Sequence, residues 1–445
     1  MPTIQIFFLI LKNSIIIIIM KILFYSWNSN NETSFIDGLK EEGHEVVVYS
    51  KECVHYTRDM NLASDMIPFV HANHIEAVAS FNYFPIISLI CNTVSIPYYS
   101  WVYDCPHLTL NACSVKLPCN HIGVFDKDMA NYYNSLGVNT VFHLPLAVRP
   151  SDFQNTITKT ANKKRFSCDV SFVGSLYTGK HDYFENLKVS SQNKEKTLSL
   201  LEEYIFNYHN YSPDSLINQS NNAPCISYTS LDNCASDTPN ASTLSSQTSE
   251  LSEVYSITEA WISAMEEQGL MLGEDYFFQK EELVLSSIFE TKMTTEERHI
   301  LLTEVAKKLG TRFHLHTNSD LSSSKELRKC SCGIVNYHTE MPLVFNQSRI
   351  NLNISLRSIH SGIPLRVLDI MACGGFVLSN YQPELAELFV PDSEIVLFDS
   401  LEDALEKIDY YLSHEDERMR IANAGLKAVS ERFSYKEGIN KLMHS

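Results

Sequence analysis

The segment DVSFVGSLYTGKH contains residues whose spacing could bind phosphate. From Gly174 to Lys180 it reads G-x-x-x-x-G-K, the spacing of a loop whose backbone N–H groups surround a nucleotide triphosphate. That motif continues with Ser or Thr, which binds Mg²⁺, whereas His181 follows here. Asp399, after the apolar run EIVLF, would be the acidic partner of such a site. Two interpretations stay open: an ATPase loop, or a loop that binds phosphate without magnesium.

A second candidate for binding an anion is the segment SIHSGIPLRVLDIMACGG. Gly362 precedes Pro364, which we expect at the first position of a helix that ends near Cys373, so free backbone N–H groups would face an anion. Arg366, in the first turn, adds a positive charge. Asp369 lies five residues after Pro364, which places it ~7.5 Å from Pro364 along the helix axis. That distance matches the reach from a pyrophosphate to the ribose hydroxyls of the same nucleotide.

The same segment also fits a purely structural helix. In that interpretation Arg366 and Asp369 form an i,i+3 surface pair, and the apolar positions Ile363, Val367, Ile370 and Met371 belong to the core. His360 could hydrogen-bond a sugar or its phosphate, or could be a structural histidine. Glu384 could contact the same ligand, although an exposed helix face explains it equally well.

Asp104 and His107, in the segment WVYDCPH, are the candidates for acid–base chemistry in the first half of the chain. They follow the strand expected from Pro97 to Tyr103, and open α/β sheets bind ligands at that end of their strands. A carboxylate there could deprotonate a hydroxyl group. The alternative is that Asp104 caps a turn with Pro106.

The elements that must position these residues alternate between strands and helices in both halves of the chain. The pattern predicts an α/β fold with doubly wound parallel sheets, and Gly43 is expected to end the first helix in a left-handed conformation. The predicted organisation is an apolar extension at 1–19, a first domain at 20–150, a linker at 151–165, and a second domain at 166–445. The second domain contains an insert at about 185–310, of which the Ser/Thr/Asn-rich part, 212–252, is expected to be mobile.

Composition excludes several classes of function. The net charge of -18 and the lack of a long basic run argue against binding to nucleic acid or anionic lipid. Eleven cysteines without a CxxC pair predict reduced thiols in a cytoplasmic protein, with neither disulfides nor a zinc site. Lys12, Asn13 and Ser14 interrupt the apolar N-terminal runs, so we expect no firm membrane anchor.

A family resemblance rests on two long segments of the chain. The segment from NQSRINLNISLRSIHSGIPLRVLDIMACGGFVLSN to EDALEKIDYYLSHEDERMRIANAGLKAV resembles the C-terminal half of the CgeB-like, spore-maturation type of glycosyltransferase. FNYFPIISLICNTVSIPYYSWVYDCPH and HLPLAV resemble the domain that precedes it. The resemblance implies a GT-B fold, with two Rossmann-like domains facing across a cleft. It also implies a nucleotide-sugar donor (UDP-, GDP- or similar) bound mainly by the second domain, with no permanently bound cofactor.

The resemblance also assigns roles to individual residues. Related enzymes carry an Arg and, five residues later, a Lys in the glycine loop, and both contact the donor pyrophosphate; the matching positions here are Ser175 and Lys180. They also carry two acids eight residues apart, the second of which binds ribose, and the matching positions are Ser361 and Asp369.

The expected activity is metal-independent, hexosyltransferase-like transfer to a glycan, a cell-surface polysaccharide or a protein. In it, Lys180, Arg366 and the helix start at Gly362 neutralise the leaving group. The departures at Ser175 and Ser361 favour the alternative, a non-catalytic carbohydrate- or nucleotide-binding relative with an assembly role.

Overall fold

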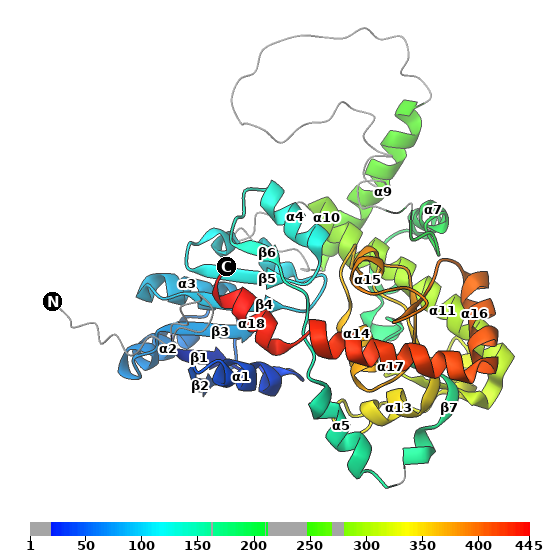
Figure 1. Cartoon of the computed structure of the whole chain (residues 1–445). Helices are drawn as coiled ribbons and strands as arrows, with labels where there is room; N and C mark the ends of the chain where they lie inside the picture. The colour runs from blue at the N-terminus through cyan, green and yellow to red at the C-terminus, as the bar shows by residue number, and fades with distance from the viewer. Residues whose placement is uncertain (1–18, 162, 210, 212–246, 269–279) are drawn as a thin grey trace. The chain divides into compact units, whose positions relative to one another are not determined.

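The computed structural model describes residues 19–161, 163–209, 211, 247–268 and 280–445 (Figure 1). The chain divides into two units: unit 1 comprises residues up to Ala147 together with Phe433–Ser445, and unit 2 comprises Val148–Arg432. No helix among the described residues is long and apolar enough to cross a membrane.

Unit 1 is built on a six-stranded parallel sheet with the order β2-β1-β3-β4-β5-β6. The order reverses direction between β1 and β3, as in doubly wound sheets that bind ligands at this point. Every residue of β3 and β4 is buried, as expected for strands covered on both faces. The strands are β1 (Lys21–Tyr25), β2 (Glu45–Tyr49), β3 (Ala77–Phe81), β4 (Tyr98–Val102), β5 (Asn120–Val124) and β6 (Val141–His143).

Four α-helices connect these strands, and their ends follow local sequence signals. Asp59 and Asp126 cap α2 and α4 by accepting backbone N–H groups two or three residues into the helix. Gly43 has a φ of 96° directly after α1, which confirms the predicted left-handed stop. The helices are α1 (Glu32–Glu41), α2 (Met60–Ala72), α3 (Pro85–Val94) and α4 (Lys127–Ser135).

The last helix of the chain, α18 (Tyr435–Met443), packs on the unit 1 sheet (red in Figure 1). Gly438 allows this approach, because a Cβ atom there would lie 2.1 Å from a ring carbon of Trp101. The ring of Tyr435 meets the same indole edge-on at 5.7 Å. Residues 433–445, which the sequence analysis assigned to the second domain, therefore group with unit 1.

Unit 2 contains a five-stranded parallel sheet with the order β11-β10-β9-β7-β8. As in unit 1, the first strand of the sheet lies between the second and the third, so this sheet is also doubly wound. Its order reverses direction between β7 and β9. The strands are β7 (Cys168–Val173), β8 (Phe313–His316), β9 (Ser348–Asn353), β10 (Val377–Asn380) and β11 (Val396–Phe398).

The segment 151–165, predicted to be a linker without helical periodicity, is largely helical. Helix α5 (Pro150–Lys159) begins with a proline in its first turn and buries Phe153 and Ile157, which are one helical turn apart. The Gln154 side chain donates a hydrogen bond to the Ala372 carbonyl at 3.3 Å. Two apolar residues were too few for the periodicity to be recognised in the sequence.

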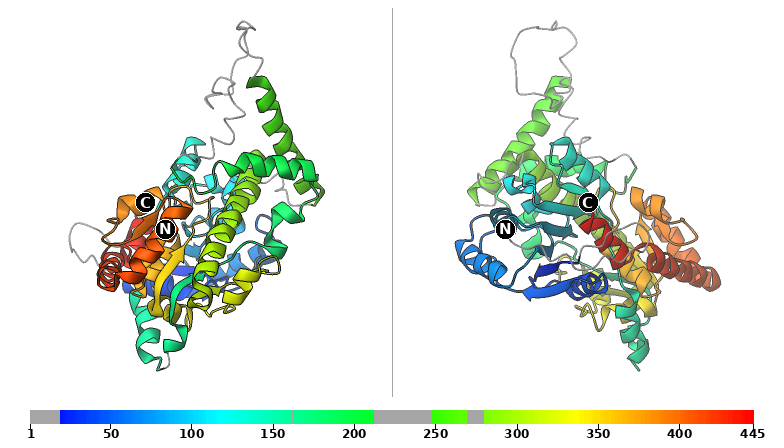
Figure 2. Two further views of the ribbon diagram at one scale, coloured as in Figure 1. Left: turned by 90° about the vertical axis from the view of Figure 1, so that its right-hand side faces the viewer. Right: turned by 60° about the vertical axis from the view of Figure 1, so that its left-hand side comes forward.

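The predicted insert also contains part of the core. Helix α11 (Glu290–Leu309) is the long yellow-green helix in Figure 2. Its Leu301, Leu302 and Val305 are buried in the core cluster of the unit 2 sheet. It continues a π-helical turn, Leu285–Phe289, and α10 (Lys280–Val284). Of the stretch expected to be mobile, 212–246 lies outside the described residues and 247–252 begins α9 (Gln247–Glu267). The other helices before α11 are α6 (Tyr183–Asn186) and α7 (Ser191–Glu202).

The remaining helices of unit 2 connect and cover the later strands. They are α12 (Lys325–Cys330), α13 (Met341–Gln347), α14 (Leu365–Ala372), α15 (Pro383–Leu388), α16 (Leu401–Ser413) and α17 (Glu415–Arg432).

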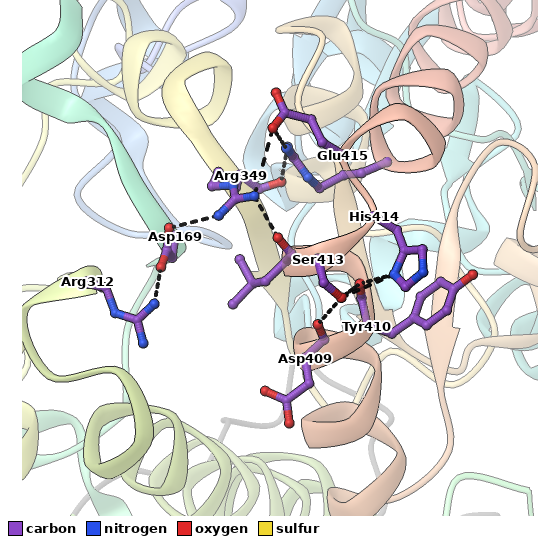
Figure 3. A network of polar contacts seen from close by, with 10 residues as sticks. Asp169, Arg312, Arg349, Asp409, Tyr410, Ser413, His414 and Glu415 are labelled. Atoms are coloured by element: carbon purple, nitrogen blue, oxygen red, sulfur yellow. Dashed lines mark hydrogen bonds and ion pairs between the residues drawn. The ribbon is translucent and has the colours of Figure 1, made fainter.

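A polar network joins the amino ends of β7 and β9 (Figure 3). Asp169 forms ion pairs with Arg312 at 2.7 Å and with Arg349 at 3.4 Å. Arg349 also donates a hydrogen bond to the Leu412 carbonyl at 2.6 Å, which ties the sheet to the end of α16. These contacts stabilise the sheet at the amino ends of its strands, whereas the loops of the candidate site leave the carboxyl ends.

Candidate functional site

The loop Gly174–Lys180 leaves the carboxyl end of β7 and is fixed by the loop that follows β8. The Gly174 N–H donates to the His316 carbonyl at 3.0 Å, and the Leu176 N–H donates to Ser319 Oγ at 2.7 Å. Ser175 Oγ lies 3.3 Å from Ser319 Oγ and accepts the Tyr177 N–H at 2.9 Å. The loop conformation is therefore held by contacts within unit 2.

Lys180 is exposed on a single 3₁₀ turn, Gly179–His181. A four-residue helix, α6, follows this turn. A triphosphate loop instead leads into a long helix whose N-terminus faces the phosphates. Asp399 follows β11, which is separated from β7 by two strands, so it cannot serve as the magnesium ligand of this loop. The ATPase interpretation is therefore not supported.

Arg298 of α11 is a candidate that the sequence analysis missed. Its guanidinium donates to the Ser175 carbonyl at 2.6 Å and, through Nε at 3.1 Å, to the Ile354 carbonyl. It also lies over the rings of Phe172 and Tyr177 at 5.5 and 5.2 Å. Arg298 thus joins the loops that follow β7 and β9, where the order of the sheet reverses.

Arg298 forms no ion pair within 4 Å among the described residues, although Glu297 interacts with its charge. The side chain is 8% exposed, and its guanidinium donates to two carbonyl groups. Burial lowers the pKa of Arg298, Tyr177 and Glu297 oppose this effect, and Arg366 adds to it. The guanidinium groups of Arg298 and Arg366 thus both lie near the reversal point, where they can interact with an anion, although Glu297 and Asp369 offset part of their charge. An anion would be stabilised there.

Helix α11 also anchors the loop after β9 through a buried ion pair. Arg357 is 5% exposed and Glu297 is fully buried; Arg357 Nε donates to Glu297 Oε1 at 2.9 Å. Thr294 Oγ1 accepts the Arg357 N–H at 2.9 Å. Four residues of α11 contact this loop, and they share one face of the helix because they recur at helical spacing. They are Glu290, Thr294, Glu297 and Arg298. The loop is therefore rigidly positioned.

His360 lies in this loop and pairs with a buried carboxylate. Its Nε2 is 2.8 Å from Glu290 Oε1, which also accepts the Tyr211 hydroxyl at 2.5 Å. Glu290 Oε2 is buried and has no partner among the described residues. The contact supports the structural interpretation of His360, although 28% of the side chain remains exposed and can reach a ligand.

Ser361 and Glu384 form a direct pair. The Ser361 hydroxyl donates to Glu384 Oε1 at 2.9 Å, and the Glu384 N–H donates to the Ser361 carbonyl at 3.0 Å. Glu384 is 2% exposed, so it does not lie on an exposed helix face, and that alternative is wrong. A carboxylate therefore lies beside the position at which the resemblance expects one.

Helix α14 begins one residue later than predicted, at Leu365, with Pro364 as its N-cap. No side chain caps this end. The Val367 N–H donates to the Pro364 carbonyl at 3.0 Å. Gly362, just before the cap, is buried. The N–H groups of the first turn before Val367 are thus the ones that could face an anion.

Arg366 and Asp369 form the i,i+3 pair of the structural interpretation, with 3.6 Å between guanidinium and carboxylate. The four predicted core residues, Ile363, Val367, Ile370 and Met371, are buried. Asp369 itself is 2% exposed and accepts the Tyr337 hydroxyl at 3.0 Å. Burial raises the pKa of Asp369 to about 6, against the lowering effects of Arg366 and Tyr337. An ionised carboxylate at this position is thus energetically costly to the fold.

Unit 1 has a pocket of about 680 Å³ at the carboxyl ends of its strands. Residues after β1, β2, β3 and β4 line it, so it lies at the reversal point of the sheet. Trp27, Tyr56 and Phe84 supply aromatic surface, and Trp27 stacks with Tyr103 at an interplanar angle of 13°. Such an aromatic wall beside polar groups suits a ligand with both apolar and hydroxylated faces.

The structure brings Asp104 and His107 together in this pocket. Asp104 is exposed, and its carboxylate accepts the Asn82 amide at 2.6 Å. Asn82 Oδ1 in turn accepts the Tyr103 N–H at 3.1 Å. Asn82 thus orients Asp104, a role that the sequence did not reveal. The exposed carboxylate can accept a proton from a bound hydroxyl group.

His107 has a different role from Asp104. Its Nε2 lies 3.1 Å from the Tyr83 nitrogen and 3.2 Å from the Tyr83 carbonyl oxygen, so contacts within unit 1 engage this nitrogen. Burial lowers the pKa of His107, although Asp104 opposes this effect. Thr109 Oγ1 lies 2.8 Å from Nε2 and donates to the Tyr83 carbonyl at 2.7 Å. With Nε2 engaged in these contacts, Nδ1 is the ring nitrogen that can interact with Asp104 or with a ligand.

Comparison with known proteins places this geometry in context. Residues 298–444 match a family model described as glycosyl transferase-like. The chain is similar to the structure of a glycosyltransferase from Rickettsia africae, with 10% sequence identity and a TM-score of 0.50. The aligned region includes 96% of this chain and 97% of the Rickettsia chain. The fold is that of the GT-B glycosyltransferases. HepE from Anabaena, in complex with UDP and glucose, covers 96% of this chain and 100% of its own, with 9% identity and a TM-score of 0.48. A comparison with curated proteins found no match.

Proposed function

We propose that this protein is a glycosyltransferase that transfers a sugar from a nucleotide-sugar donor to a hydroxylated acceptor. The observation that carries the proposal is a buried arginine at the reversal point of the unit 2 sheet. There, the buried Arg298 joins the loops after β7 and β9, with Arg366 nearby. The match of residues 298–444 to a glycosyl transferase-like family supports it.

In this proposal the donor pyrophosphate lies between the loop Gly174–Lys180 and the start of α14. Lys180 supplies a mobile, exposed charge, and the N–H groups after Pro364 supply fixed donors. Arg298 takes the part of the arginine that the resemblance expects at Ser175, because its guanidinium contacts the carbonyl of that residue. Neutralising the leaving diphosphate is the main catalytic effect, and no metal ion takes part in the transfer.

The sugar and ribose groups would be bound by the acidic residues of the site. Glu384, paired with Ser361, is placed to accept sugar hydroxyls in the role that the resemblance gives to position 361. His360 contacts the sugar or its phosphate from the loop after β9. Asp369 accepts the ribose hydroxyls after it is released from Tyr337.

The acceptor would bind in the unit 1 pocket, with Asp104 as the base if the reaction inverts the anomeric configuration. We include in this proposal a cytoplasmic location, a hexosyl donor and the CgeB-like subtype. The acceptor would be a glycan, a cell-surface polysaccharide or a protein.

The experiment that tests the proposal incubates the protein with nucleotide-sugars and a set of glycan acceptors, without added divalent cation. The expected result is release of free nucleoside diphosphate that increases when an accepted glycan is present. The Asp369→Ala variant should lose this turnover. Saturable donor binding without hydrolysis or transfer would instead support the non-catalytic relative, which the burial of Asp369 favours.

A further inference from the structure

Two histidines on the edge strand β8 point away from the hydrophobic core. Phe313 and Leu315 of this strand are fully buried in the core cluster of unit 2. Because successive side chains alternate between the faces of a strand, His314 and His316 both lie on the opposite face. Their ring centroids are 6.1 Å apart.

A cysteine from another part of the chain joins them. After α12 the chain returns along β8: Ser331 forms a parallel bridge with Leu315, and the Cys332 N–H donates to the Leu315 carbonyl at 2.8 Å. This register places the three side chains together, and the potential ligand atoms of His314, His316 and Cys332 all lie within 4.8 Å of one another.

His316 is the unusual member of the cluster. It is 5% exposed, and neither Nδ1 nor Nε2 has a hydrogen-bond partner among the described residues. The backbone of Gly333 lies close by without forming a hydrogen bond of normal geometry. Buried imidazoles normally have a partner. A ring with both nitrogens unused, directed towards a second histidine and a thiol, indicates that a ligand is accommodated there.

We propose that His314, His316 and Cys332 bind a divalent metal ion of borderline softness, of which Zn²⁺ is the representative. Two imidazoles and one thiolate are ligands that Zn²⁺ prefers over oxygen donors. Tetrahedral coordination needs ligand atoms about 3.3–3.7 Å apart, from bond lengths of about 2.0 Å to nitrogen and 2.3 Å to sulfur. Cys332 is exposed and can close the remaining gap by rotating its side chain.

The chemistry of the three groups is consistent with this assignment. The imidazole rings of His314 and His316 would each supply one nitrogen to the ion in their neutral form. The Cys332 thiol contacts the Cys330 carbonyl at 3.7 Å and would release its proton to solvent as the Zn–S bond forms. In the proposed site, a water molecule would occupy the fourth position of a tetrahedral ion.

The site is separate from the proposed transfer chemistry but lies near the candidate phosphate loop in the folded unit. An ion bound there would fasten β8 to the segment after α12. The His316 carbonyl holds Gly174, and Ser319 holds Leu176, so the same strand end supports the candidate phosphate loop. A metal ion would therefore have a stabilising role. No zinc site was expected from the sequence, because it lacks a CxxC pair and the His-x-His spacing at 314–316 was not recognised.

Cobalt titration tests the proposal on the reduced, full-length protein after treatment with a chelator. We expect one tightly bound Co²⁺ per chain, with visible bands typical of tetrahedral coordination and a near-ultraviolet band from sulfur to cobalt. The Cys332→Ser variant should lose the sulfur band, and His314→Gln should weaken binding at least tenfold. Zn²⁺ should displace Co²⁺ and raise the melting temperature of the parent but not of Cys332→Ser.

Cys113→Ser is the matched control, because Cys113 is also an exposed free thiol but lies in unit 1. It should leave the cobalt spectrum unchanged. Neither substituted side chain belongs to the buried core, and circular dichroism without metal checks that each variant is folded. The proposal is overturned if the parent shows no saturable binding, if Cys332→Ser keeps the sulfur band, or if Cys113→Ser loses it equally.

Discussion

Replacing Asp369 by Asn should stabilise the fold at neutral pH while it weakens donor binding. The carboxyl is 2% exposed, and burial raises its pKa from 3.8 to about 6. At ~1.4 kcal/mol per pKa unit, keeping it ionised in the folded state costs about 3 kcal/mol. Because the folded-state pKa is the higher one, its contribution to stability is fully present below about pH 4 and is lost as the pH rises through about 6.

The variant removes this titration, so its advantage over the parent should depend on pH. At pH 7.5 we expect the free energy of unfolding to rise by up to about 3 kcal/mol, less roughly 1 kcal/mol for weaker contacts with Tyr337 and Arg366. At pH 5 the parent carboxyl is mostly protonated in the folded state, and the gain from removing the charge should be about half as large.

Urea unfolding of both proteins at the two pH values, followed by circular dichroism, measures this difference. Glu406→Gln, at an exposed position of α16, is a control for replacing a carboxylate by an amide. A difference between variant and parent that stays constant from pH 5 to 7.5 would refute the reasoning. So would a variant that is less stable at both values. A stabilised variant that also loses donor binding would show that the costly carboxylate is retained for function.

Three further substitutions test other parts of the account. Arg298→Met leaves two buried carbonyl groups without a hydrogen-bond donor. It should therefore lower the free energy of unfolding by about 2–4 kcal/mol in urea titrations and weaken donor affinity in calorimetry, and Arg298→Lys should restore part of that affinity. Asp104→Asn should lower kcat by about 10²-fold or more in a transfer assay of an inverting enzyme, while donor affinity measured by calorimetry is unchanged. Gly438→Ala should destabilise unit 1 by about 1–3 kcal/mol in thermal unfolding, because its methyl group would clash with Trp101. Unchanged stability and donor affinity of Arg298→Met, an unchanged kcat of Asp104→Asn, or an unchanged thermal stability of Gly438→Ala would contradict the corresponding role.

The doubly wound fold was predictable because its signals are local. Buried parallel strands appear as continuous apolar runs, and Gly43 and the capping aspartates mark the helix ends. Helix α5 was missed because it has only two buried apolar residues, too few for a recognisable period. Helix α11 was assigned to an insert because its burial depends on packing against strands far away in the sequence.

The candidate site was predictable only where its residues follow strands directly. Asp104 and the loop after β7 were found in this way, because ligands gather at the carboxyl ends of strands. Arg298 was not found, because a single arginine in a polar helix has no signature until the fold brings it to the Ser175 carbonyl. Its neighbours on α11 offered a weak signal, since Glu290, Thr294 and Glu297 repeat at helical spacing. The pairing of Glu384 with Ser361 likewise depends on tertiary structure.

The central claim is that the loops after β7 and β9 bind the diphosphate of a nucleotide-sugar. Isothermal titration of the full-length protein with UDP-, GDP-, ADP- and TDP-sugars tests it most directly. We predict saturable binding of at least one of them with one site per chain. Lys180→Ala should weaken this binding at least tenfold, whereas Lys188→Ala, at another exposed lysine, should leave it unchanged. Absence of binding to every member of the panel, or equal affinities for the parent and Lys180→Ala, would contradict the account.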